Sequence, residues 1–254
     1  ANSIGLPRLR GRSMFAPMVR IAGMGTHGMD SESASKFAVA VWDWPVRLAH
    51  WVIVVLVVAL ITTGKIGNDA LVWHIRCGET LLAVVLFRVA WGFAGSGNAH
   101  FASFVRGPAA VARYVRSLLR GPHEVHATHN PLGGWSVVAM LSALSVQVAT
   151  GLFLVDEDYG FEGPLARYAS ASVADFLEEV HEANYGVIGA LVALHLAAIA
   201  YYTVVKRQDL VRAMLTGVRR LAPGAQDSRG GGPATAAAIA IAAGAAVWWL
   251  LARD

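Results

Sequence analysis

Long apolar runs, separated by polar segments, divide this chain of 254 residues. Five of the runs are long enough, or nearly so, to cross a hydrocarbon core of about 30 Å as helices that rise about 1.5 Å per residue. The shortest follows the segment VWDWPVR, whose tryptophans and arginine are typical of a membrane interface. The pattern predicts five transmembrane helices, over Leu48–Thr63, Ala70–Phe93, Gly133–Val155, Val180–Val205 and Ala234–Ala252.

The composition supports a membrane setting. Hydrophobic residues make up 56% of the chain and charged residues only 15%, whereas soluble domains carry about 25% charged residues. We expect no cleavable signal peptide, because the stretch before Ala40 contains arginines but no apolar segment of the roughly 7–15 residues that such a peptide needs. The single cysteine, Cys77, excludes an internal disulfide and a thiolate-bound metal cluster within this chain.

Basic residues are sorted along the chain by segment. They gather ahead of the first predicted helix, between the second and third, and after the fourth, whereas the connection between the third and fourth has Arg167 as its only base. Cytoplasmic segments are rich in Lys and Arg, so we predict a cytoplasmic N-terminus and a C-terminus outside. This sorting explains the basic composition without nucleic acid as a partner. The outer connection carries seven acidic residues: Asp156, Glu157, Asp158, Glu162, Asp175, Glu178 and Glu179.

The fifth predicted helix differs from the other four. Its sequence, AAAIAIAAGAAVWWLLA, carries no charged residue, and it follows PGAQDSRGGGP, a composition typical of a flexible linker. The intramembrane polar residues of interest all lie in the first four helices. We therefore predict an all-α membrane protein, built as a four-helix transmembrane bundle with one appended C-terminal helix.

Four histidines lie in or beside the first four helices, and depth restricts how they can pair. His50 lies at the inner end of its helix, whereas His74 and His181 lie at the outer ends of theirs. His195 follows His181 by fourteen residues, roughly 21 Å deeper and about 40° round the same helix. Pairing His50 with His74 or His181 would demand a contact across most of the bilayer. We predict that His74 pairs with His181 and His50 with His195, provided that the first helix begins earlier or tilts.

Two facing imidazoles across an apolar bundle suit bis-histidine ligation of haem, which needs neutral nitrogens and a six-coordinate iron. A hydrogen bond between helices explains a single intramembrane histidine equally well. Four histidines at matched depths have no such simple structural explanation, and ionisable groups inside a membrane are functional by default. The pattern therefore favours two haem sites, one near each membrane surface.

Six segments carry a family resemblance: RLAHW, WHIRCGETLL, FRVAWG, HNPLGGW, ATGLF, and the long stretch from HEANYGVIGALVALHLAAIAYY to KRQDLVRAMLTG. Together they resemble the prokaryotic cytochrome b561 family, which includes the b-type subunits of nickel–iron hydrogenases. The resemblance implies a four-helix cytochrome of the bacterial cytoplasmic (inner) membrane with two b haems. It also implies electron transfer between membrane quinone and a partner protein or small oxidant. The family's haem-ligand positions match His50, His74, His181 and His195.

The extent of the resemblance sets the predicted domain boundaries. Residues 1–40 are predicted to form a cytoplasmic N-terminal tail, and residues 41–217 the four-helix dihaem core. Residues 218–233 are predicted as a linker, and residues 234–254 as the fifth transmembrane helix and the C-terminus.

Two arginines are candidates for contact with the propionates of the inner haem. Arg88 follows His74 by the same fourteen residues that separate His181 from His195, so it should face the inner haem, where a propionate would pair with its guanidinium. The alternative is that Arg88 extends to the inner head groups. Arg47, three residues before His50, could meet the same propionates or serve only to set the topology. Arg76 falls on roughly the opposite face from His74.

Other polar residues carry weaker signals. Gln147 is expected to hydrogen-bond to a neighbouring helix, and Glu79 is a candidate proton carrier for quinone chemistry. The segment HEVHATHNPLGG, with His123, His126 and His129, suggests a metal site, but a loop with one carboxylate and no cysteine argues against it. The basic segment with Arg113, Arg116 and Arg120 predicts a surface helix against lipid head groups.

Three functions fit these observations. The first is a dihaem b-type cytochrome that transfers electrons between membrane quinone and a periplasmic partner, such as a cytochrome c or a dehydrogenase or hydrogenase subunit. In this case the acidic outer connection would steer a basic carrier to the outer haem. The second is a stand-alone oxidoreductase that acts on superoxide or ferric iron at the outer haem. The third is a transporter or anchor without haem.

Overall fold

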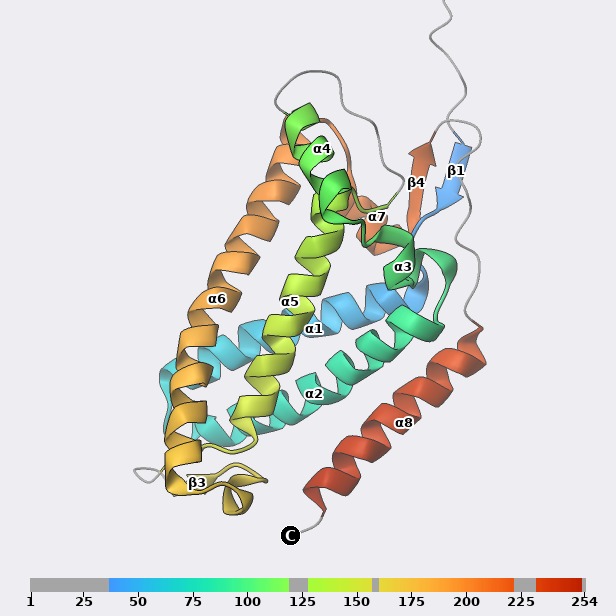
Figure 1. Cartoon of the computed structure of the whole chain (residues 1–254). Helices are drawn as coiled ribbons and strands as arrows, with labels where there is room; N and C mark the ends of the chain where they lie inside the picture. The colour runs from blue at the N-terminus through green and yellow to red at the C-terminus, as the bar shows by residue number, and fades with distance from the viewer. Residues whose placement is uncertain (1–36, 119–127, 157–159, 222–231, 253–254) are drawn as a thin grey trace, which may run out of the picture. The chain divides into compact units, whose positions relative to one another are not determined.

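The computed structural model describes residues 37–118, 128–156, 160–221 and 232–252, and the described part is mostly helical. Five helices in it are long and apolar enough to cross a membrane, in agreement with the predicted number of spans (Figure 1). They are α1 (Trp44–Ile66), α2 (Ala70–Ala94), α5 (Pro131–Gly151), α6 (Ala171–Val204) and α8 (Pro233–Leu251).

Shorter elements lie between and beside the long helices. They are the helices α3 (Phe101–Phe104), α4 (Pro108–Leu118) and α7 (Leu210–Thr216), the 3-10 turns Gly97–Ala99 and Ala166–Tyr168, and the strands β1 (Phe37–Ala40), β2 (Val155–Asp156), β3 (Phe161–Glu162) and β4 (Val218–Leu221). Strand β1 pairs antiparallel with β4, and β2 with β3.

Helix α1 begins four residues before the predicted span, because a polar cap sets its start. The carboxylate of Asp43 accepts a hydrogen bond from the backbone N–H of Val46 at 2.9 Å, and a proline stands in the first turn. Such a cap stabilises a helix by about 1 kcal/mol. The second oxygen of Asp43 accepts from Trp91 Nε1 at 2.9 Å and from Ser96 Oγ at 2.5 Å. One carboxylate therefore ties the start of α1 to the end of α2.

Helices α5 and α6 also depart from the predicted spans. Helix α6 begins at Ala171 rather than Val180, because its first turns, ASVADFLEEV, are good helix formers although too polar for a hydropathy-based span. Helix α5 ends at Gly151 rather than Val155. The apolar run continues past it, but there the backbone turns to pair with the following loop, where the N–H of Leu165 donates to the carbonyl of Leu152 at 2.8 Å.

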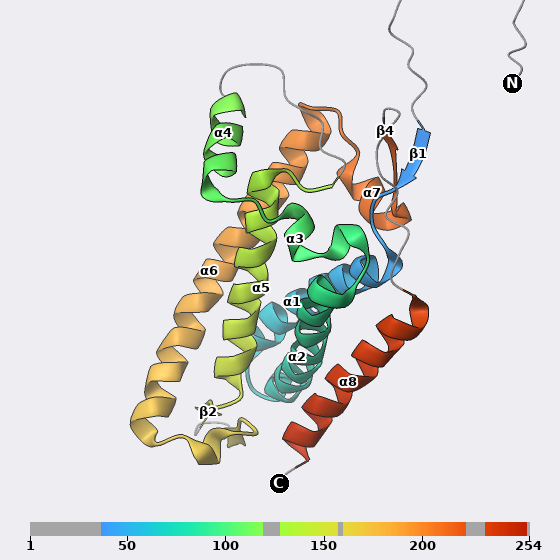
Figure 2. The same cartoon turned by 45° about the vertical axis from the view of Figure 1, so that its right-hand side comes forward.

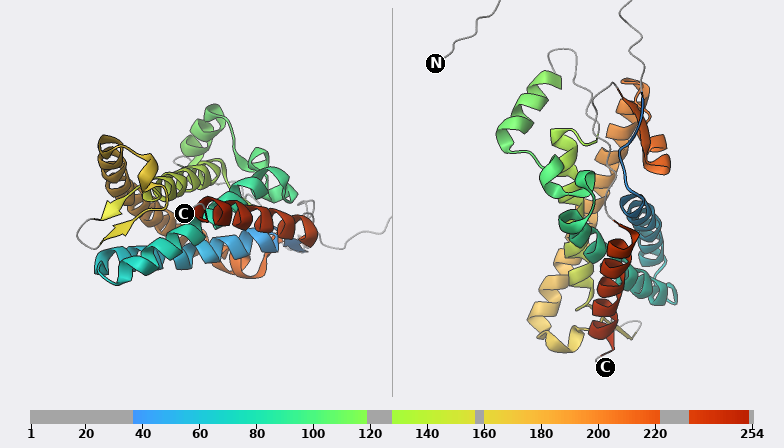
Figure 3. Two further views of the ribbon diagram at one scale, coloured as in Figure 1. Left: turned by 90° about the horizontal axis from the view of Figure 1, so that it is seen from below. Right: turned by 90° about the vertical axis from the view of Figure 1, so that its right-hand side faces the viewer.

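The long helices pack as two antiparallel hairpins, α1 with α2 and α5 with α6, and α2 also contacts α5 and α8 (Figures 1 and 2). Helix α8, red in Figures 2 and 3, lies beside α2. The buried core between the hairpins contains Leu81, Val85, Ala143, Leu144, Val148 and Ile188. Large apolar side chains elsewhere on the helices are exposed, as expected where lipid surrounds a multi-pass membrane protein.

The bundle has two ends, which we name after the predicted topology. The outer end carries the connection 67–69 and the described parts of the next connection, 152–156 and 160–170. The inner end carries the β1–β4 sheet, α3, α4 and α7 (Figure 1). The β1–β4 pairing was not anticipated: four residues of the predicted tail pair with four of the predicted linker. Strands of this length, separated by about the whole core, leave no readable pattern in the sequence.

Candidate functional site

The structure brings His50 and His195 together near the inner end. Their ring centres lie 6.4 Å apart, with the ring planes inclined by 52°. Metal–imidazole bonds of about 2 Å on opposite sides of one ion place ring centres roughly 6 to 6.5 Å apart. The earlier start of α1 reduces the depth mismatch between these two residues, because His50 then lies deeper within its helix. Their role as haem ligands stays a prediction.

His74 and His181 line one cavity near the outer end. It has a volume of about 500 Å³ and lies among α1, α2, α5, α6 and the loop after α5. This volume falls in the range of about 300–1,000 Å³ that is typical of ligand and cofactor pockets. Its deeper walls are apolar and include Val57, Leu60, Leu144, Val148 and Ile188. The cavity therefore offers an apolar sleeve with two imidazoles in its lining.

Both outer histidines have hydrogen-bond partners at Nδ1. Nδ1 of His74 lies 3.0 Å from the backbone carbonyl of Leu60, with Thr63 Oγ1 further away at 3.4 Å. Nδ1 of His181 lies 2.9 Å from Thr150 Oγ1. Because a carbonyl only accepts hydrogen bonds, the proton of His74 sits on Nδ1 and leaves Nε2 free to bind a metal.

The inner end contains buried polar atoms that lack a hydrogen-bond partner in the described part of the chain. These atoms are His50 Nδ1, Arg88 Nη1, Arg47 Nε, His129 Nδ1 and His100 Nε2. Buried polar groups nearly always have partners. Two of the five, Arg88 Nη1 and Arg47 Nε, belong to guanidinium groups, which only donate and therefore lack acceptors. The carboxylate groups of a haem would supply acceptors, so these residues fit the predicted cofactor.

Arg88 is buried, with 7% of its surface exposed, and does not extend to the membrane surface. Its guanidinium lies over the ring of Phe101, 5.4 Å from the ring centre. This is the placement expected of a residue that faces the inner site. The carboxylate of Asp43 acts on the guanidinium electrostatically, but Nη1 is buried without a hydrogen-bond partner in the described part of the chain. Because such a donor is costly to leave unpaired, Arg88 is well placed to bind a propionate.

Arg47 has a structural partner instead. Its Nη2 donates to the backbone carbonyl of Leu215 at 2.5 Å, which ties α1 to the end of α7. Gly217, with φ +82°, follows directly, and a Cβ there would lie 2.8 Å from Nη1 of Arg47. Nε of Arg47 is buried without a hydrogen-bond partner in the described part of the chain. Contact with a propionate therefore stays a weaker prediction for Arg47 than for Arg88.

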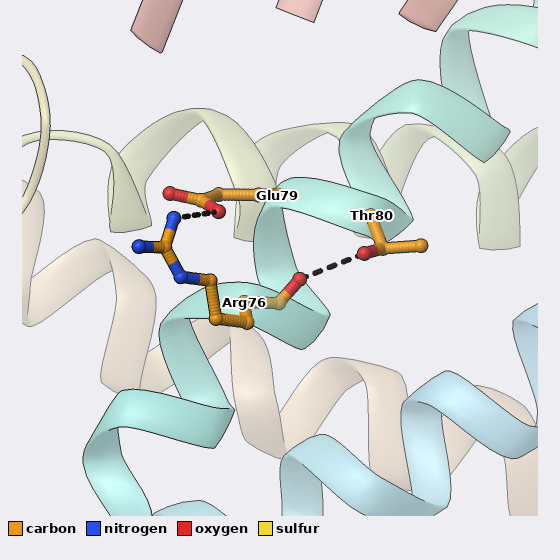
Figure 4. A network of polar contacts seen from close by, with 3 residues as sticks. All are labelled: Arg76, Glu79 and Thr80. Atoms are coloured by element: carbon orange, nitrogen blue, oxygen red, sulfur yellow. Dashed lines mark hydrogen bonds and ion pairs between the residues drawn. The ribbon is translucent and has the colours of Figure 1, made fainter. Parts of the chain in front are cut away.

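Arg76 and Glu79 form an ion pair on α2, with 3.0 Å between Nη1 and Oε2 (Figure 4). The side chain of Arg76 is 68% exposed and that of Glu79 only 15%. Arg76 thus points away from the bundle, as the helix geometry predicted. Glu79 lines the outer cavity together with His74, and its role as a proton carrier stays a prediction.

His129 was missed as part of the inner site. Its ring centre lies 4.8 Å from that of Trp42 and 4.7 Å from that of Phe104. Burial, with smaller contributions from Arg88 and His195, lowers the pKa of His129 to about 3. The sequence grouped it with His123 and His126, which lie outside the described residues. A usable signal was the N-cap Asn130, which places the preceding residue at the start of a bundle helix.

Two other expectations can be compared with the structure. Gln147 does hydrogen-bond to a neighbouring helix: Nε2 donates to the carbonyl of His181 at 3.1 Å, and Oε1 accepts from Asn184 at 2.7 Å. No cluster of three or more metal-ligating side chains occurs in the described ranges. A bis-histidine site needs only two protein ligands.

Acidic side chains surround the outer cavity. Asp156, Glu162, Glu178 and Glu182 line it with Glu79, and Lys65 is the basic residue among its lining. Glu157 and Asp158 lie outside the described residues. Three of the seven acidic residues predicted for the outer connection, Asp156, Glu162 and Glu178, therefore line the same cavity as His74 and His181, whereas Asp175 and Glu179 are not part of its lining.

Comparison with known proteins adds two findings. A family model described as prokaryotic cytochrome b561 matches residues 41–217. The chain is also 23% identical over 234 residues to a protein of Bradyrhizobium diazoefficiens named "Probable Ni/Fe-hydrogenase B-type cytochrome subunit". That alignment covers 79% of this chain and 93% of the relative.

Proposed function

Because the chain belongs to the prokaryotic cytochrome b561 family, we propose that it is a dihaem cytochrome of the bacterial inner membrane. In this proposal it passes electrons between membrane quinone and a redox protein on the outer, periplasmic side. Family membership identifies the chain as a b-type cytochrome. It therefore argues against the third function, a transporter or anchor without haem. The observation that supports the proposal is that the rings of His50 and His195 face one another at one end of the bundle, while His74 and His181 line one cavity at the other.

Each histidine pair would hold one haem, His74 with His181 at the outer end and His50 with His195 at the inner end. Haem would supply one-electron chemistry there, and the chain's own residues would bind and orient it. The imidazoles would provide neutral nitrogens to the iron, Arg88 would bind a carboxylate, and the apolar walls of the bundle would exclude water.

The acidic lining of the outer cavity supports a basic electron carrier as partner. A cluster of negatively charged carboxylates around a site attracts a positively charged protein and raises its association rate by tenfold or more at low salt. The Bradyrhizobium relative is named as a cytochrome subunit of a hydrogenase. A dehydrogenase or hydrogenase subunit is therefore also a candidate redox partner for this chain. Quinone is proposed as the membrane-side reactant because the family implies it.

The second candidate is a stand-alone oxidoreductase that acts on a small species at the outer haem. The same carboxylates favour it, because Glu79, Glu178 and Glu182 line the cavity together with His74 and His181. Hard cations such as ferric iron bind oxygen ligands. Superoxide, an anion, is disfavoured by this lining.

The test uses the detergent-purified, full-length chain and monitors its reduction and reoxidation by absorption spectroscopy. A quinol should produce reduced b-type bands, and a basic cytochrome c should then reoxidise them faster than ferric chelates or superoxide do. Reoxidation by ferric iron alone would select the second candidate. Absence of b-type bands, or bands that neither quinol nor quinone affects, would contradict the proposal.

A further inference from the structure

The two outer histidines are held by the same local arrangement, repeated in the two hairpins. A Thr–Gly pair stands at the end of the first helix of each hairpin: Thr63–Gly64 in α1 and Thr150–Gly151 in α5. Each threonine bonds back to the carbonyl four residues earlier, at 2.7 Å for Thr63 and 2.9 Å for Thr150. Each pair meets the histidine of the following long helix, His74 or His181.

The glycine of each pair lets the imidazole lie directly against the neighbouring helix. A Cβ on Gly64 would stand 3.1 Å from both Cε1 and Nδ1 of His74. A Cβ on Gly151 would stand 3.1 Å from Cε1 of His181. Both glycines therefore lie against the ring edge that carries Nδ1, and a Cβ at either position would require the ring to move by a few tenths of an ångström.

The hydrogen bonds at Nδ1 assign the tautomer of both rings. His74 donates from Nδ1 to the carbonyl of Leu60. The hydroxyl proton of Thr150 is directed to the carbonyl of Val146, so its oxygen accepts a hydrogen bond from Nδ1 of His181 at 2.9 Å. In both rings Nε2 is then the unprotonated nitrogen, the one that can bind a metal.

His50, of the inner pair, lacks this arrangement. Nδ1 of His50 is buried without a hydrogen-bond partner in the described part of the chain. The outer histidines are thus oriented by hydrogen bonds from the protein, whereas His50 is not. A hydrogen bond from Nδ1–H makes the opposite nitrogen a more basic ligand, and a more basic ligand stabilises ferric over ferrous iron.

We propose that the two Thr–Gly pairs are positioning elements for the axial ligands of the outer haem, and that Thr150, through His181, lowers the reduction potential of that haem. This inference rests on the proposed assignment of His74 and His181 as its ligands. Thr150 touches no reacting atom; it acts through the imidazole of His181 alone.

The test compares Thr150→Val with Thr150→Ser in the full-length, haem-loaded protein by potentiometric titration and electron paramagnetic resonance. Valine keeps the shape of threonine and removes the acceptor, so the outer component should become easier to reduce. Removing a hydrogen-bond partner of a metal ligand alters metal-site equilibria by about tenfold or more, which for one electron is about 59 mV. Thr150→Ser should restore the wild-type potential, and the inner component should not move in either variant.

Ser145→Ala is the matched control. Ser145 lies on the same helix and makes the same backward bond, to the carbonyl of Leu141 at 2.7 Å. Its removal should leave both potentials unchanged.

The outcomes separate this inference from the proposed function. Loss of the outer haem in Thr150→Val but not in Thr150→Ser would also support it, because only the acceptor differs. An unchanged potential in Thr150→Val with both haems retained would overturn the inference alone, as would equal loss of haem in both variants. A wild-type protein that binds no haem at His181 would instead contradict the proposed function.

Discussion

The two ends of the bundle hold their histidines in different ways. At the outer end, His74 and His181 are hydrogen-bonded to the neighbouring helices and line a cavity of about 500 Å³. At the inner end, the rings of His50 and His195 are 6.4 Å apart, and Nδ1 of His50 and Nη1 of Arg88 are buried without partners.

The two ends differ in whether the protein alone provides hydrogen-bond partners for the buried polar atoms of the site. The outer ligands are oriented by protein atoms alone, because every donor at their Nδ1 atoms meets an acceptor. The inner end contains buried donors whose desolvation is offset only when acceptors arrive. We expect the inner site to depend on charge pairing with the cofactor, and the outer site to depend on close helix packing.

Among the substitutions that test this difference between the two ends, we expect the largest effect at Arg88. Arg88→Leu removes the buried guanidinium, so retention of the inner haem should fall by roughly tenfold or more, while the outer haem stays bound. The measurement is haem content and a redox titration that resolves the two components. Arg76→Leu, an exposed position on the same helix, is the control and should change neither. Full retention of the inner haem in Arg88→Leu, at an unchanged potential, would show that Arg88 binds no propionate.

Close packing at the outer end is tested by Gly151→Ala. The new methyl group would stand 3.1 Å from Cε1 of His181, so the ring should shift and the outer haem should be lost or become partly high-spin. Electron paramagnetic resonance measures this change. Gly186→Ala, on α6 with open space around its Cβ, is the matched control and should leave the spectrum unchanged. Equal effects of both variants would mean that general helix changes, rather than contact with His181, are responsible.

The smallest expected effect concerns the acidic lining of the outer cavity. Replacing Glu162, Glu178 and Glu182 by glutamine should leave both haems bound but slow electron transfer to a basic cytochrome c at low salt. In the wild type the rate should fall as salt rises from 0.1 to 1 M, because the Debye length shrinks from about 10 Å to about 3 Å. Stopped-flow kinetics measure both slopes. Identical slopes in variant and wild type would exclude steering by these residues.

Much of this architecture could be predicted from the sequence, because it depends on properties that a single chain displays. Hydropathy located the five spans, and the sorting of basic residues indicated which connections share a side of the membrane. The spacing of His181 and His195 restricted the pairing of the four histidines. The helix ends were less accurate, since the cap at Asp43 and the polar first turns of α6 do not register as hydropathy.

The features that were missed depend on contacts between distant segments. Thr63 and Thr150 look like ordinary residues of apolar helices, and only the packing of α1 on α2 and of α5 on α6 brings them to the histidines. His129 looked like a loop residue, because its burial between Trp42 and Phe104 arises from three separate segments. The β1–β4 pairing likewise joins two stretches that have no visible relation in the sequence.

The central claim is that four histidines form two haem sites, one at each end of the bundle. The most direct test is pyridine haemochrome analysis with redox titration of the wild type and of His50→Ala, His74→Ala, His181→Ala and His195→Ala. The wild type should contain two b haems per chain. His74→Ala and His181→Ala should lose the same redox component, and His50→Ala and His195→Ala the other, because five-coordinate iron in a pocket shaped for six ligands is poorly retained. One haem per chain in the wild type, or loss of the same component in His50→Ala and His74→Ala, would contradict the account.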